Sequence, residues 1–382
     1  MKRVILIVLD SLGIGYAPDA QAFNDEGANT LASIIAQKPS LVNLSKLGLG
    51  NIDKIPYMED EEAPLGVYGA LEEISAGKDT TIGHWEMAGL EINRPFPTYP
   101  EGFPEEVVSA FEARTGLKAL CNLPYSGTEV IKDYGREHIE TGNPIIYTSN
   151  DSVFQIAAHE EVIPLDRLYE ICRIAREILV GDHAVARVIA RPFVGEEGDY
   201  TRTSNRRDFS VLPFERTVLD DIKDQGLEVI GIGKIGDIFA GAGITEELPT
   251  TSNMDGVDRV LEVMERDFSG LIFANLVDFD ANFGHRRNPQ GYAQALEDFD
   301  RRLPEIYAKL RDEDLLMITA DHGNDPTFRG TDHTRERVPL LIYKRGIEAR
   351  NLGSLRGFYN ISASLYDYLE LKGPHLGESI LL

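Results

Sequence analysis

Short, uninterrupted runs of apolar residues recur in the first and last parts of the chain. They cover residues 4–9, 228–232, 271–277, 315–319 and 338–343. Such runs are too short for typical helices, and their lack of alternation is typical of strands covered on both faces, as in a parallel sheet. Helical stretches lie between and around them, at residues 30–47, 216–225, 254–268 and 289–311. This alternation predicts an α/β core with a doubly wound, mostly parallel sheet.

The middle of the chain follows a different plan. Residues 94–104 read RPFPTYPEGFP, a proline-rich stretch that is typical of a connector. Beyond it, we expect helices at residues 105–114 and 166–179 and strands at residues 144–148 and 187–190. We therefore expect a second α/β domain inserted into the first, as a cap. The expected division is core 1–97, cap 98–216 and core 217–382.

Composition narrows the class of protein. The 382 residues are 42% hydrophobic and 26% charged, which is typical of a globular protein of about two domains. The net charge is −25, from 63 acidic and 38 basic residues. This excess argues against nucleic acid and anionic membranes as partners, and no apolar run approaches the ~20 residues of a membrane span. We expect a cytoplasmic enzyme; the sequence does not indicate its oligomeric state.

Acidic residues or histidines follow three of the predicted strands: Asp10 after the first, Asp278 and Asp280 after the second, and Asp321 and His322 after the third. In doubly wound sheets, ligands bind beyond the carboxyl ends of the strands. His285 follows Asp280 by five residues, and His333 lies in the loop ADHGNDPTFRGTDHT, residues 320–334. Carboxylates and imidazoles donate lone pairs to divalent ions such as manganese or zinc. Each short motif alone could be a polar surface loop, but together they predict a site for two ions.

The segment GKDTTIGHWE, residues 77–86, contains two adjacent threonines, Thr80 and Thr81. A threonine hydroxyl becomes a useful nucleophile only beside a base or a metal ion. The alternative is a helix cap or a turn. These residues alone do not choose between Thr80 and Thr81.

Arginines are concentrated in the predicted cap. They are Arg187, Arg191, Arg202, Arg206 and Arg207. One interpretation is surface ion pairing in an acidic protein. The other is phosphate binding, for which the planar guanidinium group is well shaped. The two interpretations stay open at this point.

Long motifs spread over nearly the whole chain carry a family resemblance. They read VLDSLGIGYAPDA, GKDTTIGHWE, YTSNDSVFQIAAHEE, VIARPFVG with TRTSNRRDF, NLVDFD with FGHRR, and ADHGNDP with GTDHTRE. Together they resemble the phosphopentomutases, a family of isomerases in the alkaline phosphatase superfamily. Ile82 stands where relatives often carry a second hydroxyl, so no role of that hydroxyl transfers to this chain.

The resemblance implies a metal-binding core with an inserted cap, and roles for individual residues. It implies a phosphorylated nucleophile at Thr80. It implies two manganese ions held by Asp10, Asp280, His285, Asp321, His322 and His333. It implies contacts with the sugar phosphate from Ser149, Asp151, Arg187, Arg202 and Lys234.

The implied reaction interconverts ribose 1-phosphate and ribose 5-phosphate, and the corresponding 2-deoxyribose phosphates. Phosphorylated Thr80 would donate its phosphoryl group to give a sugar bisphosphate, and a sugar bisphosphate activator would phosphorylate Thr80 first. The cap would close to exclude water, which would otherwise hydrolyse the phosphothreonine. The alternatives are a metal-dependent phosphomonoesterase, another phosphosugar mutase on the same core, or a non-catalytic sugar phosphate-binding protein.

Overall fold

The computed structural model describes residues 1–53, 55–149 and 151–381. The chain forms two compact units. Unit 1 comprises Met1–Arg94 with Pro213–Leu382, and unit 2 comprises Pro95–Leu212. The first connection between the units therefore falls inside the proline-rich stretch.

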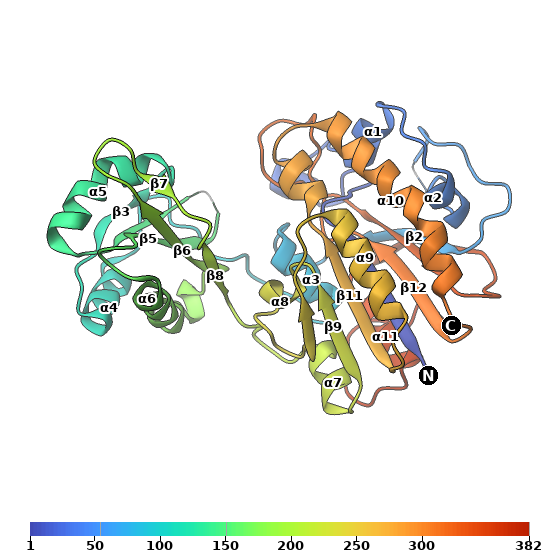
Figure 1. Ribbon diagram of the computed structural model, residues 1–382. Coiled ribbons are helices and arrows are strands. Elements are labelled where there is room, and N and C mark those ends of the chain that lie inside the picture. The colour runs from blue at the N-terminus through green and yellow to red at the C-terminus, as the bar shows by residue number, and fades with distance from the viewer. Residues whose placement is uncertain (54, 150, 382) are drawn as a thin grey trace. The chain divides into compact units, whose positions relative to one another are not determined.

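An eight-stranded sheet forms the centre of unit 1 in the described part of the chain (Figure 1). Its strands, in spatial order, are β10 (Glu246–Leu248), β9 (Glu228–Ile232), β11 (Gly270–Leu276), β1 (Arg3–Leu9), β12 (Asp314–Thr319), β13 (Val338–Tyr343), β2 (Val67–Glu72) and β14 (Arg350–Arg356). Every residue of β11, β1 and β12 is buried. The apolar runs in these strands are uninterrupted because helices cover both faces of this part of the sheet, so neither face needs polar side chains.

Most of this sheet is parallel, as expected. Strands β10, β9, β11, β1 and β12 all run in one direction, and β13 runs antiparallel to β12 and β2. Leu9 is paired with Leu276, and Val8 is paired with Thr319, so β11, β1 and β12 end at the same edge. The reversal of β13 explains why that apolar run has no acidic residue at its end. The predicted α/β fold class is confirmed.

Helices α9 (Asn253–Met264) and α10 (Pro289–Lys309) pack on one face of the unit 1 sheet, with α1 (Thr30–Ile35) and α2 (Val42–Leu47) beside α10 (Figure 1). The other face carries α3 (Thr80–Met87), α7 (Val218–Asp224), α8 (Ile235–Ile238) and α11 (Asn360–Tyr368). The 3₁₀-helix η1 (Ala20–Phe23) and the π-helix η3 (Phe279–Gly284) complete this unit's helical elements in the described residues.

The prediction of one continuous helix over residues 30–47 is wrong. The chain forms α1 and α2 with a break between them. Lys38 has a left-handed φ of 59°, and Pro39 follows it. A left-handed residue cannot continue a right-handed helix, and proline lacks the N–H group that an interior position requires.

Unit 2 contains a smaller sheet with strand order β3-β4-β5-β6-β7 and with β8 paired to β6. The strands are β3 (Leu120–Pro124), β4 (Ile145–Thr148), β5 (Val153–His159), β6 (Arg187–Val194), β7 (Thr201–Arg202) and β8 (Arg207–Ser210). Helices α4 (Glu105–Thr115) and α6 (Leu165–Ile178) share one core with the sheet, and α5 (Glu129–Thr141) shares another. The short 3₁₀-helix η2 (Gly181–His183) precedes β6.

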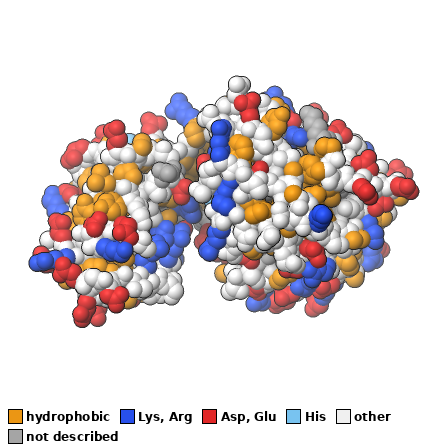
Figure 2. All heavy atoms as spheres, turned by 90° about the horizontal axis from the view of Figure 1, so that it is seen from above, with side chains coloured by type: hydrophobic (Ala, Val, Ile, Leu, Met, Phe, Trp, Pro, Cys, Tyr) orange, Lys and Arg blue, Asp and Glu red, His pale blue; other side chains and the backbone are white. Residues whose placement is uncertain are grey.

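Acidic side chains are spread over the molecular face shown in Figure 2, interspersed with Lys and Arg. The negative net charge is therefore not gathered in one patch on that face. Among the described residues, no helix is long and apolar enough to cross a membrane.

Candidate active site

Six side chains of unit 1 meet where β11, β1 and β12 end. Asp10 directly follows β1, and Asp321 and His322 come two and three residues after the end of β12. Asp280 lies in η3, after β11, and His285 follows the end of that π-helix. His333 comes from the long loop between β12 and β13. The parallel sheet topology therefore brings together residues that are more than three hundred positions apart in the sequence.

The first group of possible metal ligands is Asp10, Asp321 and His322. Their donor atoms lie within 4.8 Å of one another, and all three residues are buried. The Nε2 atom of His322 is 3.6 Å from Oδ1 of Asp10 and 3.3 Å from Oδ2 of Asp321. This spacing suits three ligands that share one ion.

The second group is Asp280, His333 and, again, His322. His285 joins it, since its Nε2 atom is 3.1 Å from Oδ2 of Asp280 and 3.1 Å from Nε2 of His333. The two groups are adjacent, and His322 belongs to both. The structure thus brings together all six residues that the sequence named as metal ligands.

Hydrogen bonds orient two of the imidazoles toward the centre of the site. The Nδ1–H group of His322 donates to the carbonyl oxygen of Gly323 at 3.0 Å, and that of His285 donates to Thr331 at 2.7 Å. Each Nε2 atom therefore carries a lone pair on the side of the carboxylates. Carbonyl partners of this kind fix the tautomer of metal-binding histidines.

Two buried carboxylate oxygens in the site have no hydrogen-bond partner among the described residues, namely Oδ1 of Asp10 and Oδ2 of Asp321. Burial and the nearby carboxylates of Asp321 and Asp280 raise the pKa of Asp10 well above its ordinary value. Burial alone would also raise the pKa of Asp280, but His333 and His285 outweigh it and hold that pKa well below its ordinary value. Unpaired buried carboxylates are costly without a cation. The donor set therefore fits divalent metal ions.

Several supporting residues were not predicted from the sequence. Asn275 donates to Oδ2 of Asp10 at 2.9 Å, and Asn324 donates to Oδ1 of Asp280 at 2.8 Å. The hydroxyl of Tyr292 donates to the carbonyl oxygen of Asp10 at 3.1 Å. Both asparagines lie within the motifs already singled out, but Tyr292 comes from the start of α10 and has no local signal.

The Thr80 hydroxyl lies beside this cluster. Thr80 is the first residue of α3, and its Oγ1 atom is 3.1 Å from Nε2 of His322. The Asp79 side chain caps the helix by accepting the N–H groups of Thr81 and Ile82. His84, four residues later on the same helix face, donates through Nδ1 to the carbonyl oxygen of Thr80 at 2.8 Å. This i, i+4 spacing is a sequence signal that could have identified His84.

Helix α3 packs closely against the chain that carries Asp321. A Cβ atom added at Gly83 would lie 2.2 Å from the carbonyl oxygen of Asp321. Only glycine permits this approach, which brings the start of α3 next to the metal ligands. Ile82 is fully buried, so its side chain packs in the core.

Two further carboxylates of the loop between β12 and β13, those of Asp325 and Asp332, have other partners. Asp325 accepts hydrogen bonds from Ser33 and Thr327, and from the N–H group of Asn29. Asp332 forms an ion pair with Lys78 at 3.2 Å. Neither residue belongs to the two groups of possible ligands.

The residues predicted to bind sugar phosphate lie at separate places. In unit 2, Ser149 and Asp151 lie between β4 and β5, and the N–H group of Asp151 donates to the Ser149 hydroxyl at 3.3 Å. Arg187 begins β6 and pairs with Asp208 at 3.5 Å. In unit 1, Lys234 directly precedes α8 and is exposed.

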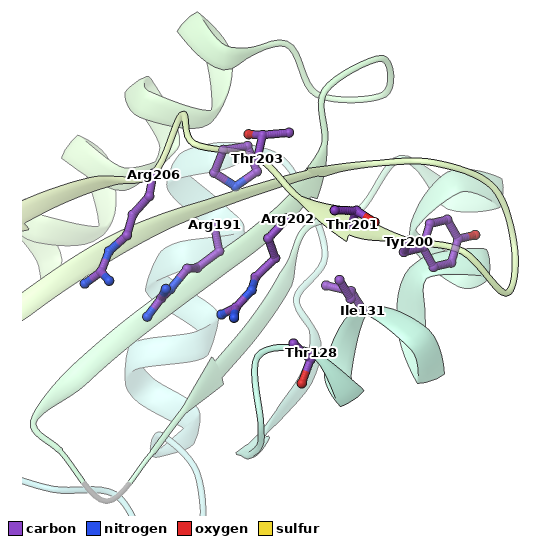
Figure 3. Close-up of a pocket in the computed structure, with 9 residues that line it drawn as sticks. Thr128, Ile131, Arg191, Tyr200, Thr201, Arg202, Thr203 and Arg206 are labelled. Carbon is purple, nitrogen blue, oxygen red and sulfur yellow. The ribbon is translucent and has the colours of Figure 1, made fainter. Parts of the chain in front are cut away.

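Arg202 lines a pocket of about 530 Å³ in unit 2, together with Arg191 and Arg206. The three guanidinium groups point the same way, with Thr128 across the pocket (Figure 3). Asp208 accepts two hydrogen bonds from Arg206 and also pairs with Arg187, so it links Arg187 to this pocket. Burial and the neighbouring Arg206 lower the pKa of Arg191. Clustered cations of this kind favour an anionic ligand.

Arg207 is oriented differently. Its guanidinium lies over the rings of Tyr169 and Phe209, 5.4 Å from each centroid. It is absent from the pocket lining. The predicted arginine cluster is therefore divided between a pocket and an aromatic surface.

Comparison with known proteins defines the class first. The family model described as "Metalloenzyme superfamily" matches residues 2–373, so the chain belongs to that superfamily. Proteins named phosphopentomutase are 56% identical in Alkaliphilus metalliredigens, over 99% of this chain and 98% of the relative, and 56% identical in Acetivibrio thermocellus, over 100% and 99%. The phosphopentomutase of Clostridioides difficile is 55% identical, over 99% and 98%. This chain belongs to the phosphopentomutase family, which confirms the resemblance seen in its motifs.

Proposed function

We propose that the protein interconverts ribose 1-phosphate and ribose 5-phosphate, and the 2-deoxyribose equivalents, through a phosphothreonine at Thr80 and a sugar bisphosphate. The observation that carries this proposal is the 3.1 Å distance from Oγ1 of Thr80 to Nε2 of His322. His322 is shared by both groups of possible metal ligands. A hydroxyl in this position is suited to exchanging a phosphoryl group.

In the proposed cycle, the P–O bond to Thr80 breaks while a bond forms to the vacant hydroxyl of the sugar. The resulting bisphosphate turns around, and its other phosphoryl group returns to Thr80. A sugar bisphosphate activator phosphorylates Thr80 for the first turnover. The capped start of α3 and the hydrogen bond from His84 hold Thr80 in place throughout. Because the transition state of phosphoryl transfer is loose, positioning and charge stabilisation supply most of the catalysis.

Two divalent ions fit the ligands described above, and we propose manganese because mixed carboxylate and imidazole ligands suit it. Asp10, Asp321 and His322 would hold one ion, and Asp280, His285 and His333 the other. When bound, the ions would neutralise charge on the phosphoryl oxygens and favour the ionised hydroxyl. The residues themselves provide the orientation, through the carbonyl contacts of His285 and His322.

The decisive experiment compares two products of ribose 1-phosphate with manganese present. We expect ribose 5-phosphate to accumulate with little free phosphate, because the phosphoryl group returns to Thr80 instead of passing to water. A coupled assay for ribose 5-phosphate, run beside a colorimetric phosphate assay, measures the ratio. Phosphate released in equal or greater amount would identify a phosphomonoesterase. Binding without either product would identify a non-catalytic sugar phosphate-binding protein.

We propose that Ser149, Asp151, Arg187, Arg202 and Lys234 bind the sugar phosphate, with Arg191 and Arg206 adding charge beside Arg202. Replacing Arg202 by Ala should raise KM about 10- to 100-fold, the range expected for losing a charge-assisted hydrogen bond worth about 1.5–3 kcal/mol. The control is Arg207→Ala, since Arg207 lies over Tyr169 and Phe209. Steady-state kinetics should show that the KM of the control stays within about twofold of the wild-type KM. Equal changes in KM in Arg202→Ala and Arg207→Ala would show that Arg202 has no specific part in binding the sugar phosphate.

A further inference from the structure

Arg335 is a buried arginine on the loop that carries His333, and only 1% of it is exposed. Its guanidinium binds the segment of chain that leads to Thr80. Nη1 donates to Oε2 of Glu73 at 2.6 Å and to the carbonyl oxygens of Ser75 and Gly77, at 2.9 and 2.6 Å. Nη2 donates to the carbonyl oxygen of Glu73 at 2.7 Å. One side chain thus binds three carbonyl groups of residues 73–77.

The N–H groups of the same segment are held from the other side. The Glu86 carboxylate is buried on α3 and accepts the N–H groups of Ile74, at 3.0 and 3.1 Å, and of Ser75, at 2.6 Å. Residues 73–77 are therefore clamped between α3 and the His333 loop. The next residues along the chain are Lys78, Asp79 and Thr80.

A second link joins the same two parts of the chain. Oδ2 of Asp25 accepts the backbone N–H group of Arg335 and the Nζ of Lys78, both at 2.9 Å. Lys78 also pairs with Asp332, the neighbour of His333. The segment before Thr80 and the loop that carries a possible metal ligand therefore share one network of charges.

We propose that Arg335 is a positioning residue for Thr80. By holding residues 73–77 against the His333 loop, it sets the distance between the Thr80 hydroxyl and the metal ligands. This inference rests on the proposed role of Thr80 in phosphoryl transfer. A guanidinium is required because its rigid fork binds a carboxylate and several carbonyl groups at once, whereas the ammonium of lysine is a single point with three donors.

The test compares Arg335→Lys with a matched control, Arg3→Lys. Arg3 is also fully buried, and it binds Asp314 and the carbonyl oxygens of Met264 and Arg266. It begins β1, at the opposite end of that strand from Asp10. Both variants should lose similar thermal stability. Only Arg335→Lys should lower kcat, by about 100-fold with KM within about threefold, as a displacement of about 1 Å would do.

A second readout does not depend on turnover. Intact mass spectrometry follows phosphorylation of Thr80 by ribose 1,5-bisphosphate in the manganese-loaded proteins, and we expect this step to be slowed in Arg335→Lys and normal in Arg3→Lys. Equal kcat and equal phosphorylation in the two variants would overturn the inference, as would a change confined to KM. If wild type becomes phosphorylated but forms no ribose 5-phosphate, the proposed function fails, while the phosphorylation rates still test Arg335.

A milder variant covers the case in which Arg335→Lys does not fold. Asp19 accepts hydrogen bonds from Nε and Nη2 of Arg335, and its side chain is 48% exposed. Asp19→Asn should therefore fold, and it should lower kcat in the same direction by about 3- to 10-fold through a smaller displacement. A wild-type kcat in this variant would count against Arg335 as a positioning residue.

Discussion

Replacing Thr80 by Ala is expected to abolish isomerisation of ribose 1-phosphate. Its hydroxyl is the group 3.1 Å from Nε2 of His322, at the junction of the two groups of possible ligands. Without it the phosphoryl group has no acceptor on the enzyme. The rate should fall by more than about 10⁴-fold, the scale seen when a covalent nucleophile is removed. The coupled assay with manganese and a sugar bisphosphate measures this loss.

Thr81→Ala is the matched control, because it removes the adjacent hydroxyl from the same helix turn. The Thr81 N–H group is accepted by Asp79, and this backbone contact survives the substitution. We expect kcat within about threefold of wild type, since substitutions outside the reacting groups have small effects. Intact mass should show phosphorylation in Thr81→Ala and none in Thr80→Ala. The reverse pattern would identify Thr81 as the nucleophile.

Removing divalent metal should abolish activity and lower the melting temperature. Asp10, Asp280 and Asp321 lie close together in a buried site, and two of their oxygens have no hydrogen-bond partner in the part of the chain that the structure describes. Ions that bind only the folded protein stabilise it by about 4 kcal/mol at 1,000 times their Kd, or on the order of 5–10 °C here. Calorimetry with chelator, then with manganese restored, measures the shift. An unchanged melting temperature would argue against ions at this site.

The effect of Asp10→Asn on the free energy of unfolding should have opposite signs in the metal-loaded and the metal-free protein. In the metal-loaded protein it removes a ligand and lowers stability. In the metal-free protein it removes a buried carboxylate that is crowded by Asp321 and Asp280, and should raise stability by about 1–3 kcal/mol, the cost of an unsatisfied buried polar group. Urea unfolding with and without manganese measures both signs. Destabilisation in both states would mean that Asp10 is structural.

The stability difference between wild type and Asp10→Asn, both without metal, should depend on pH with a definite sign. The pKa of folded Asp10 is raised above the ordinary value of 3.8, so above pH 3.8 the folded metal-free protein holds a proton that the unfolded chain has lost. Wild-type stability from this group therefore falls as pH rises through the folded pKa, and the advantage of metal-free Asp10→Asn should grow. The pKa values of Asp280 and Asp321 are lowered, so those groups act below pH 3.8, outside this window.

Local sequence determined much of this protein. Uninterrupted apolar runs predicted the buried strands, because a strand covered on both faces has no solvent-facing position to fill with polar residues. Asp10, Asp280 and Asp321 were identifiable because parallel strands present their carboxyl ends at one edge. The family was recognisable from its motifs. The prediction of one helix over residues 30–47 was wrong, because the apolar periodicity did not reveal that the chain turns at Lys38.

Only the tertiary structure decided which side chains meet. It divided the loop carboxylates: Asp321 accepts the N–H group of Ser11 at the candidate metal site, whereas Asp325 accepts a hydrogen bond from Ser33 of α1. It brought Tyr292 to Asp10 and the Arg335 guanidinium to the segment before Thr80. These contacts join residues more than two hundred positions apart in the sequence. Each one forms only when distant helices, strands and loops have packed against one another. Local patterns report which face of a helix or strand is buried, but they carry no information about the partner that covers it.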